Sequence, residues 1–96
     1  MTISSDSDLQ SKRAEILILE ESEINKLVFR LKILKEKRKF TYKDLATVTS
    51  ISEVTLYRQL TNPSTLRIST LLRLCQALEI SLSDLLADDF NKKFNI

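Results

Sequence analysis

The sequence of 96 residues contains no glycine, no histidine and no tryptophan, and it has only one proline. The absence of histidine excludes histidine-based acid–base pairs and histidine metal ligands. Without glycine there is no glycine-rich loop to hold a nucleotide phosphate. The acidic residues are scattered along the chain. We therefore expect no enzymatic activity, no catalytic residue, no metal site and no cofactor.

Cysteine and long apolar runs are equally scarce. The single cysteine, Cys75, cannot form an intramolecular disulfide, which favours a reducing compartment. No apolar run approaches the roughly 18 residues that cross a membrane. The N-terminus, MTISSDSD, lacks the basic and apolar regions of a secretory signal. These features predict a soluble, cytoplasmic protein with no membrane contact.

Basic residues are concentrated in one stretch. Eight lie between residues 26 and 43 against one acid, Glu36, whereas residues 1–22 carry five acids and two bases. The eight are Lys26, Arg30, Lys32, Lys35, Lys37, Arg38, Lys39 and Lys43. Such a stretch can attract a polyanion, but a solvated face of a lysine-rich helix has the same composition. Charge alone leaves both interpretations open.

The apolar spacing predicts a series of helices in one small domain. Ile24, Leu27, Val28, Leu31 and Leu34 recur at steps of three and four, which predicts a helix with Ser22 as N-cap and KEKRK at its end. TYKD has the pattern of a capping box and opens a second helix, with Leu45, Ala46 and Val48. Ser52 caps a third helix from Glu53 to about Leu60.

The second half of the chain continues this pattern. TNPST is a turn in which Asn62 tolerates the left-handed conformation and Pro63 stops the helix. Ile68, Leu71, Leu72, Cys75 and Leu78 mark the apolar face of a fourth helix, with Cys75 as a small core residue. Ser81 begins a fifth helix that ends near Phe90.

The predicted organisation has three parts. Residues 1–22 form an N-terminal extension whose first 11 residues are mobile, residues 23–90 form the helical domain, and residues 91–96 form a tail. Within the extension, AEILILEE at residues 14–21 is compatible with a short strand or with a helical turn. The β-branched Ile16 and Ile18 favour the strand slightly. We expect the four apolar residues to be covered, preferably by the same segment of a second chain.

The second and third helices form a helix-turn-helix arrangement. Ala46 is small enough for the close helix crossing, Ile51 fills the turn, and Leu56 points inward. The opposite face of the third helix is then polar or small: Ser52, Glu53, Val54, Thr55, Tyr57, Arg58 and Thr61. A face of this kind suits the major groove of DNA.

Residues 24–90 resemble the lambda-repressor and Cro-type helix-turn-helix domains, which are five-helix DNA-binding modules. The resemblance depends on LA at 45–46, IS at 51–52, TLYR at 55–58 and TLLRLCQALEISLSDLL at 70–86. The family usually has glycine where this chain has Lys39, Ser50, Asn62 and Glu79. A positive φ at a residue other than glycine or asparagine would cost about 1 kcal/mol. Thr49 and Gln59 stand where inward apolar residues are common, and Tyr42 where glutamine often touches a phosphate.

The resemblance also implies which residues contact DNA. The base-reading positions would be Ser52, Glu53, Val54, Tyr57 and Arg58. The phosphate contacts would be Thr41, Tyr42, Lys43, Asn62, Thr65 and Arg67. Arg58 suits guanine O6 and N7, Val54 a thymine methyl group and Glu53 the N4 of cytosine. Each of these residues is also compatible with an ordinary exposed side chain, and Glu53 with a favourable charge at a helix N-terminus.

The resemblance implies a sequence-specific, double-stranded DNA-binding transcriptional regulator of the nucleoid, acting as a homodimeric repressor on a palindromic operator. One alternative is an antitoxin that also binds its own operator, with residues 12–22 as the toxin contact. Another is an adaptor that uses the fold to bind protein and no longer binds DNA, favoured by Glu53 and the absence of lysine on the third helix. If the extension is not the dimer interface, we expect that interface around Leu85, Leu86 and Phe90.

Overall fold

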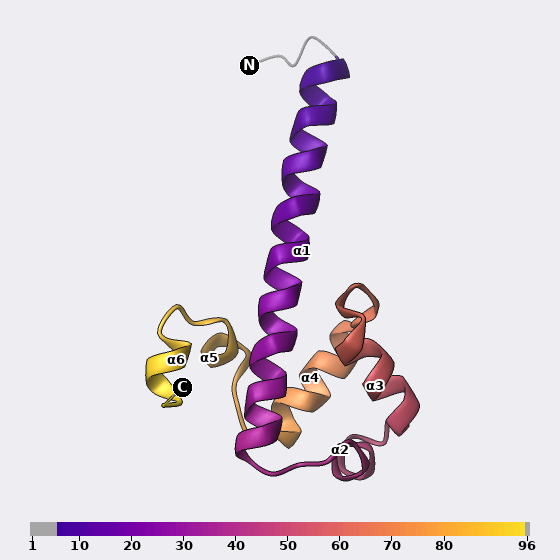
Figure 1. Cartoon of the computed structure of the whole chain (residues 1–96), viewed down its shortest axis with the longest axis vertical. Coiled ribbons are helices and arrows are strands. Elements are labelled where there is room, and N and C mark those ends of the chain that lie inside the picture. Colours follow the sequence, from indigo (N-terminus) through magenta and orange to yellow (C-terminus); the bar gives the residue numbers. More distant parts are fainter. Residues whose placement is uncertain (1–5, 96) are drawn as a thin grey trace.

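The computed structural model describes residues 6–95, and every regular element in that range is a helix. Figure 1 shows α1 (Asp6–Lys37), α2 (Tyr42–Thr49), α3 (Glu53–Thr61), the 3₁₀ helix η1 (Pro63–Thr65), α4 (Ile68–Ala77), α5 (Leu82–Leu86) and α6 (Phe90–Lys93). The predicted all-α fold is confirmed. The described part of the chain has one α-helix more than the five expected, because α6 follows α5.

α1 is a single helix of 32 residues that projects from the domain formed by the rest of the chain (Figure 1). The preference for a strand at residues 14–21 was wrong, and Ser22, expected as an N-cap, lies exposed in mid-helix. No glycine or proline interrupts this stretch, and most of its residues are good helix formers. A strand would also need a neighbouring strand for its backbone hydrogen bonds, and a helix satisfies them locally.

The N-terminal end of the chain is therefore more ordered than expected. Of the 11 residues predicted to be mobile, residues 6–11 are helical, and residues 1–5 lie outside the described part. At its other end α1 closes within KEKRK, as predicted, at Lys37.

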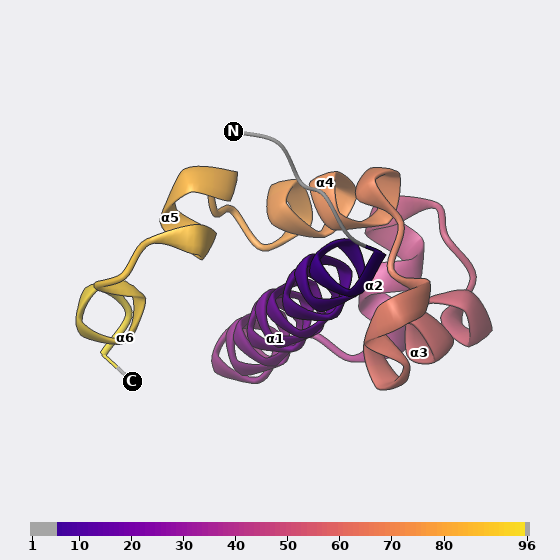
Figure 2. The same ribbon diagram turned by 90° about the horizontal axis from the view of Figure 1, so that it is seen from above.

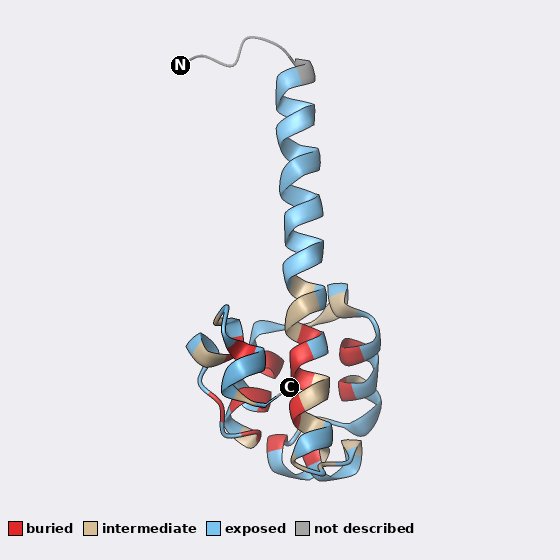
Figure 3. Ribbon diagram, turned by 60° about the vertical axis from the view of Figure 1, so that its left-hand side comes forward, coloured by how far each residue is buried: buried red, intermediate tan, exposed pale blue. Residues whose placement is uncertain are grey.

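The projecting helix gives the molecule an elongated shape. The radius of gyration of the molecule is 16.4 Å, and its extents along the principal axes are 52 × 31 × 17 Å. A compact domain of this length has a radius of gyration of about 12.5 Å. Figure 3 shows why: the buried residues surround only the C-terminal half of α1, and residues 8–23 are exposed on all sides. We call residues 8–23 of α1 the stalk.

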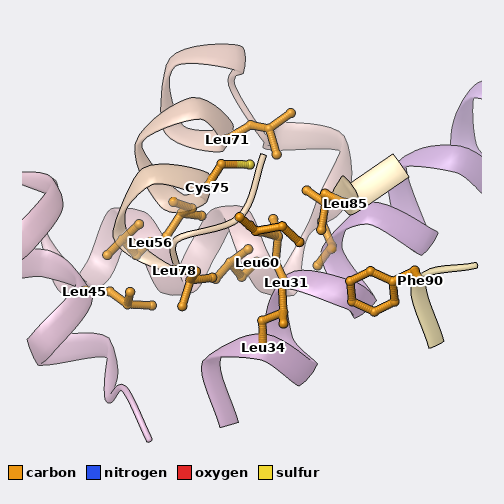
Figure 4. Close-up of a cluster of buried hydrophobic side chains, with 13 residues drawn as sticks. Leu31, Leu34, Leu45, Leu56, Leu60, Leu71, Cys75, Leu78, Leu85 and Phe90 are labelled. Carbon is orange, nitrogen blue, oxygen red and sulfur yellow. The ribbon is translucent and has the colours of Figure 1, made fainter. Parts of the chain in front are cut away.

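The core surrounds the C-terminal half of α1, which lies between α2, α3 and α4 on one side and α5 and α6 on the other (Figures 1 and 2). Figure 4 shows the side chains that meet there. The buried cluster consists of Val28, Leu31, Leu34, Leu45, Leu56, Leu60, Leu71, Leu74, Cys75, Leu78, Ile80, Leu85 and Phe90. It confirms the predicted face of α1, where Ile24 and Leu27 are half-buried, and the core position of Cys75.

The apolar face of α4 is rotated from the predicted one. Ile68 and Leu72 were expected inside but are 76% and 50% exposed. Leu74 and Thr70 are buried instead, next to Leu71 and Cys75. A helix of this length buries only one stripe, and the stripe through Leu74 excludes Leu72 because the two positions lie about 160° apart.

Arg30 is the buried cation of the domain. It was counted in the basic stretch, yet only 8% of the residue is exposed. Its Nη1 donates hydrogen bonds to the carbonyl oxygens of Leu85 at 2.7 Å and Ala87 at 3.0 Å. Its guanidinium also lies 4.7 Å from the centre of the Phe90 ring. Arg30 thus satisfies the carbonyl groups at the C-terminal end of α5 and ties that end to α1.

The C-terminal region differs from the prediction in two respects. The helix that begins at the Ser81 cap ends at Leu86, not near Phe90, and the segment expected as a tail contains α6. Phe90 packs against Phe94, with ring centres 4.9 Å apart. Of the three residues expected at an alternative dimer interface, Leu85 and Phe90 are completely buried, and only Leu86, which is 44% exposed, lies at the surface.

Three non-glycine residues adopt the left-handed backbone conformation where the family usually has glycine. Lys39, Ser50 and Glu79 have φ angles of 58°, 59° and 54°, so the conformational cost considered for these positions applies to all three. Asn62 was expected to join them and does not, since its φ is −122° and its ψ is 85°. The reason is Pro63, whose ring disfavours helical conformations at the preceding residue.

Replacement of Glu79 by glycine should stabilise the protein. The left-handed conformation costs about 1–2 kcal/mol at a non-glycine residue. Glycine removes this cost, but its greater conformational entropy in the unfolded chain offsets part of the gain in stability. We expect Glu79→Gly to raise the unfolding free energy by about 0.5–1 kcal/mol and the melting temperature by about 2–8 °C, measured by circular dichroism. Asn62→Gly is the matched control and should not stabilise. Equal effects of the two variants would contradict this account.

Loss of the Arg30 hydrogen bonds should destabilise the domain. Hydrogen bonds that involve a charged group contribute about 1.5–3 kcal/mol, so Arg30→Met should lower the unfolding free energy by about that amount in urea titrations. Arg67→Met is the control, because Arg67 is exposed and lies just before α4. If both variants lose the same stability, Arg30 does not hold α5 in place.

Candidate nucleic-acid interface

The candidate site is built on α2, the turn at residues 50–52, and α3. α2 and α3 pack on each other and on α4 or η1. Leu45 on α2 and Leu56 and Leu60 on α3 are buried in the shared core. Ala46 and Ile51 are half-buried and pack against that core, as predicted for the helix crossing and for the turn. Because these contacts fix which side of α3 is buried, they also fix which side of the helix faces outward.

The N-terminus of α2 is fixed by the predicted capping box. Thr41 Oγ1 accepts a hydrogen bond from Asp44 N at 3.0 Å, and Asp44 Oδ2 accepts one from Thr41 N at 2.9 Å. The hydrogen bond from the Thr41 backbone lowers the pKa of the Asp44 carboxyl group, so it is ionised at neutral pH. The side chain of Thr41 is therefore occupied by the cap. The Asp44 amide is occupied by the same cap, and the exposed Lys43 precedes it in the first turn.

The turn between the helices is held by two hydroxyl groups. Buried Thr49 donates to the Leu45 carbonyl oxygen at 2.6 Å and accepts from Ile51 N at 3.3 Å, which explains how a polar residue occupies an inward position. Ser52 caps α3 by accepting from Thr55 N at 3.1 Å. Ser52 Oγ also donates to Thr55 Oγ1 at 2.8 Å. Ser52 lies at the predicted place, but its hydroxyl group is already bonded within the helix.

The far end of α3 is held by Gln59, whose contact the sequence did not reveal. Gln59 is 2% exposed, and its Oε1 accepts a hydrogen bond from Arg67 N at 3.0 Å. The bond ties α3 to the loop that leads from η1 into α4. On the other side, Arg73 Nη1 donates to the Thr49 carbonyl oxygen at 3.2 Å and joins α4 to the end of α2. The C-terminal end of α2 is thus anchored to α4, and α3 is anchored to the loop before α4.

The outer side of α3 is an exposed arc. Glu53, Val54, Tyr57, Arg58 and Thr61 are all exposed, and Val54 is 75% exposed. The side chains of Leu56, Gln59 and Leu60 point the other way and are buried. We call the five exposed residues the recognition arc.

Tyr42 joins the start of α2 to the recognition arc. Its ring meets the ring of Tyr57 edge to face, with centres 5.5 Å apart, and Lys35 Nζ lies 4.6 Å from the centre of the Tyr42 ring. Burial, and to a lesser degree Tyr57 and Glu36, raises the pKa of the Tyr42 hydroxyl group. The phenol is therefore protonated at neutral pH and can donate a hydrogen bond.

The remaining predicted phosphate-contact residues lie at the other end of α3. Asn62 is exposed, with its Oδ1 accepting from Ser64 Oγ at 3.0 Å, and Thr65 Oγ1 donates to the Asn62 carbonyl oxygen at 2.7 Å. Arg67 is exposed just before α4. The predicted contacts thus form two groups, Thr41–Lys43 before the recognition arc and Asn62–Arg67 after it. Within each group the exposed cation, Lys43 or Arg67, is the side chain best able to reach a phosphate.

The basic stretch at residues 26–43 is only partly available to a polyanion. Arg30 is buried, Lys35 covers Tyr42, and Lys37 donates to the carbonyl oxygens of Phe94 and Asn95. Arg38 is half-buried, and its Nη1 is a buried donor without a partner. Much of the positive charge that the sequence shows thus serves the fold, which the sequence alone could not reveal.

Other kinds of site are not supported by the described residues. No group of three or more possible ligands for a metal ion occurs among them. Cys75 is buried, and burial raises the pKa of its thiol, so it is a poor nucleophile. Within residues 6–95 no helix is long and apolar enough to cross a membrane.

Comparison with known proteins agrees with this geometry. A search of curated proteins and a search of solved structures each returned no match. The family model of the Cro/C1-type helix-turn-helix DNA-binding domain matches residues 30–91, which include the last eight residues of α1 and every helix from α2 to α5. The match covers more than half of the chain and includes the recognition arc. The chain therefore belongs to the Cro/C1-type helix-turn-helix family and is a DNA-binding regulator.

Proposed function

We propose that the protein is a transcriptional repressor that binds a palindromic operator in double-stranded DNA as a homodimer. The observation that carries the proposal is the recognition arc, exposed along the whole of α3 and bordered by the capped N-terminus of α2. An α-helix fits the major groove of B-DNA, where base edges can be distinguished. A helix N-terminus beside that groove suits a backbone phosphate.

The chemistry of the recognition arc assigns a role to each side chain. Arg58 can donate two hydrogen bonds to guanine O6 and N7, Val54 can contact a thymine methyl group, and Glu53 can accept from cytosine N4. Tyr57 would contact a base edge close to the phosphate contact proposed for Tyr42, because the two rings meet edge to face. Ser52 contributes through its position at the helix start, because its hydroxyl group already caps α3.

Phosphate binding is assigned to the two groups beside the arc. Lys43 and Arg67 supply charge, and the protonated Tyr42 hydroxyl group supplies a donor. Thr41, Asn62 and Thr65 shape the two helix ends, and the backbone amides next to them complete the contacts.

A dimer and a repressor role follow from the size of the arc. One recognition helix contacts only a few base pairs, and a two-fold axis doubles the site on a palindrome. A dimer on an operator blocks that stretch of DNA for other proteins, so repression is the simplest outcome. The site of action would be the nucleoid, in the cytoplasm.

One further candidate function is supported by a specific feature. The exposed stalk, residues 8–23, contains the segment assigned to a toxin contact, so an antitoxin that binds its own operator is the second proposal. An adaptor that binds protein only through α3 is favoured by Glu53 and by the absence of lysine on that helix. Selection of bound duplexes from a random DNA pool distinguishes the adaptor from the other two functions, because only the adaptor would enrich no sequence.

Binding to the selected duplex should depend on salt. Each cation that neutralises a phosphate adds about 0.9 to the slope of log affinity against log salt concentration, so Lys43 and Arg67 on two protomers predict a slope of about −3 to −4. Fluorescence anisotropy at salt concentrations from about 50 to about 200 mM measures this slope. A flat dependence would contradict the proposed DNA contacts.

Arg58→Ala and Lys43→Ala should have different effects. Loss of a bidentate base contact costs about 1–3 kcal/mol per half-site, so Arg58→Ala should weaken binding to the selected duplex and relax one base position. Lys43→Ala should weaken binding to selected and random duplexes by the same factor and reduce the salt slope. Repeating the selection with each variant measures both effects. If the two variants lose selected and random DNA in equal proportion, Arg58 does not contact a base.

A further inference from the structure

The stalk carries an apolar stripe that its own domain does not cover. Leu17, Ile24 and Leu31 follow one another at intervals of seven residues, as do Arg13, Glu20, Leu27 and Leu34 in the adjacent row. Leu9 and Ile16 flank these rows. Because seven residues are close to two helical turns, the stripe is the continuation of the face that α1 buries in the core. Leu9, Ile16 and Leu17 are 51%, 58% and 53% exposed.

The stripe also leads into a groove at the base of the stalk. Leu17, Glu20, Glu21, Ile24 and Asn25 form its wall on α1, and Asn62, Pro63 and Ser64 form the opposite wall. Its surface is more apolar than polar. A second helix lying along the stripe would end in this groove, so the groove and the stripe together have the shape of a helix-binding surface.

The charges within the stripe favour a second copy of the stalk as its partner, in the antiparallel orientation. Arg13 and Glu20 lie in the middle of the stripe, both exposed, and neither forms an ion pair within the described residues. In a parallel pair of stalks, Arg13 would meet Arg13 of the other copy and Glu20 would meet Glu20. Both contacts would bring like charges together and would be repulsive. In an antiparallel pair, Arg13 of each copy meets Glu20 of the other.

The apolar residues have the same symmetry as the charges. Arg13 and Glu20 are equidistant from a point between Ile16 and Leu17, and so are Leu9 and Ile24. Around this point, Ile16 of one copy faces Leu17 of the other, and Leu9 faces Ile24. Every residue of the stripe thus meets a residue of suitable chemistry in a second copy, which is the property of an isologous interface. The overlap from Leu9 to Ile24 is about 24 Å long.

We propose that the stalk is a self-association surface, on which the stalks of two chains pair antiparallel with the two-fold axis between Ile16 and Leu17. The inference deepens the proposed function, on which its meaning for DNA binding rests, because a two-fold axis is what a palindromic operator requires. The pairing itself involves no residue of the recognition arc, so it can be tested without DNA.

Charge reversal on the full-length chain tests the direction of pairing. Arg13→Glu and Glu20→Arg should each raise the dissociation constant of the dimer at least tenfold in sedimentation equilibrium, since each places like charges at both contacts. The double variant, with both substitutions, should return the constant to within about threefold of the original, because the opposite charges meet again. Glu15→Arg, on the other side of the helix, is the matched control and should change it little.

Several outcomes would overturn the proposal. They are an unaltered chain that stays monomeric across the concentration range, single variants that dimerise like the unaltered chain, and a double variant that does not recover. The first would leave the stalk to a different protein, such as a toxin. Circular dichroism at the same concentrations must show that the domain remains folded in each variant.

A separate measurement distinguishes this proposal from the proposed function. Binding to a duplex that contains a single half-site does not need a dimer. A monomer that binds the half-site would overturn the stalk pairing and leave the regulator intact. A dimer with charge rescue that selects no DNA would do the reverse.

Discussion

The burial of one face of α1 among the other five α-helices is the constraint on which the rest of the domain depends. Val28, Leu31 and Leu34 are the residues that α1 contributes to the buried cluster. Each helix from α2 to α6 adds at least one buried side chain to it. None of those helices exceeds ten residues. Helices this short are not stable alone in water, so they exist because packing on α1 and on one another holds them. The orientation of α3 is a consequence of that packing.

Buried polar groups then decide where the loops lie. Arg30 holds the end of α5, Thr49 holds the turn before α3, and Gln59 holds the loop before α4. In a chain without glycine, the hydrogen bond from Ile51 N to Thr49 also spans the turn at Ser50, where the left-handed conformation is unfavourable. The turns at Lys39 and Glu79 are closed by backbone hydrogen bonds, from Phe40 N to Lys35 O and from Ile80 N to Cys75 O. The turn at Ser50 belongs to the DNA-binding motif itself, so some of the strain lies next to the recognition arc.

Features of short range were the ones that could be predicted from the sequence. The caps at Thr41, Ser52 and Ser81, the end of α1 and the exposed face of α3 depend on residues a few positions apart. The Arg30 contacts could not be foreseen, because their partners lie 55 and 57 residues away. The stalk was mistaken for a strand because a short apolar run has no helical period of its own. Asn62 was misjudged because its neighbour Pro63 overrides the tendency of asparagine. The DNA contacts of individual side chains stay predictions.

The exposure of the stalk has a thermodynamic consequence of its own. Residues 8–23 are exposed throughout, so their helical order depends on intrinsic propensity and on continuity with the core half of α1. Any partner of the stalk must bind the ordered form, and the fraction of chains in which the stalk is frayed lowers the apparent affinity in proportion. Ser11 and Ser22 lie on the side of the helix away from the stripe. Alanine at these positions would lower the fraction of chains with a frayed stalk, because alanine has a higher helix propensity than serine. Affinity for the partner can therefore be adjusted at positions that the partner never touches.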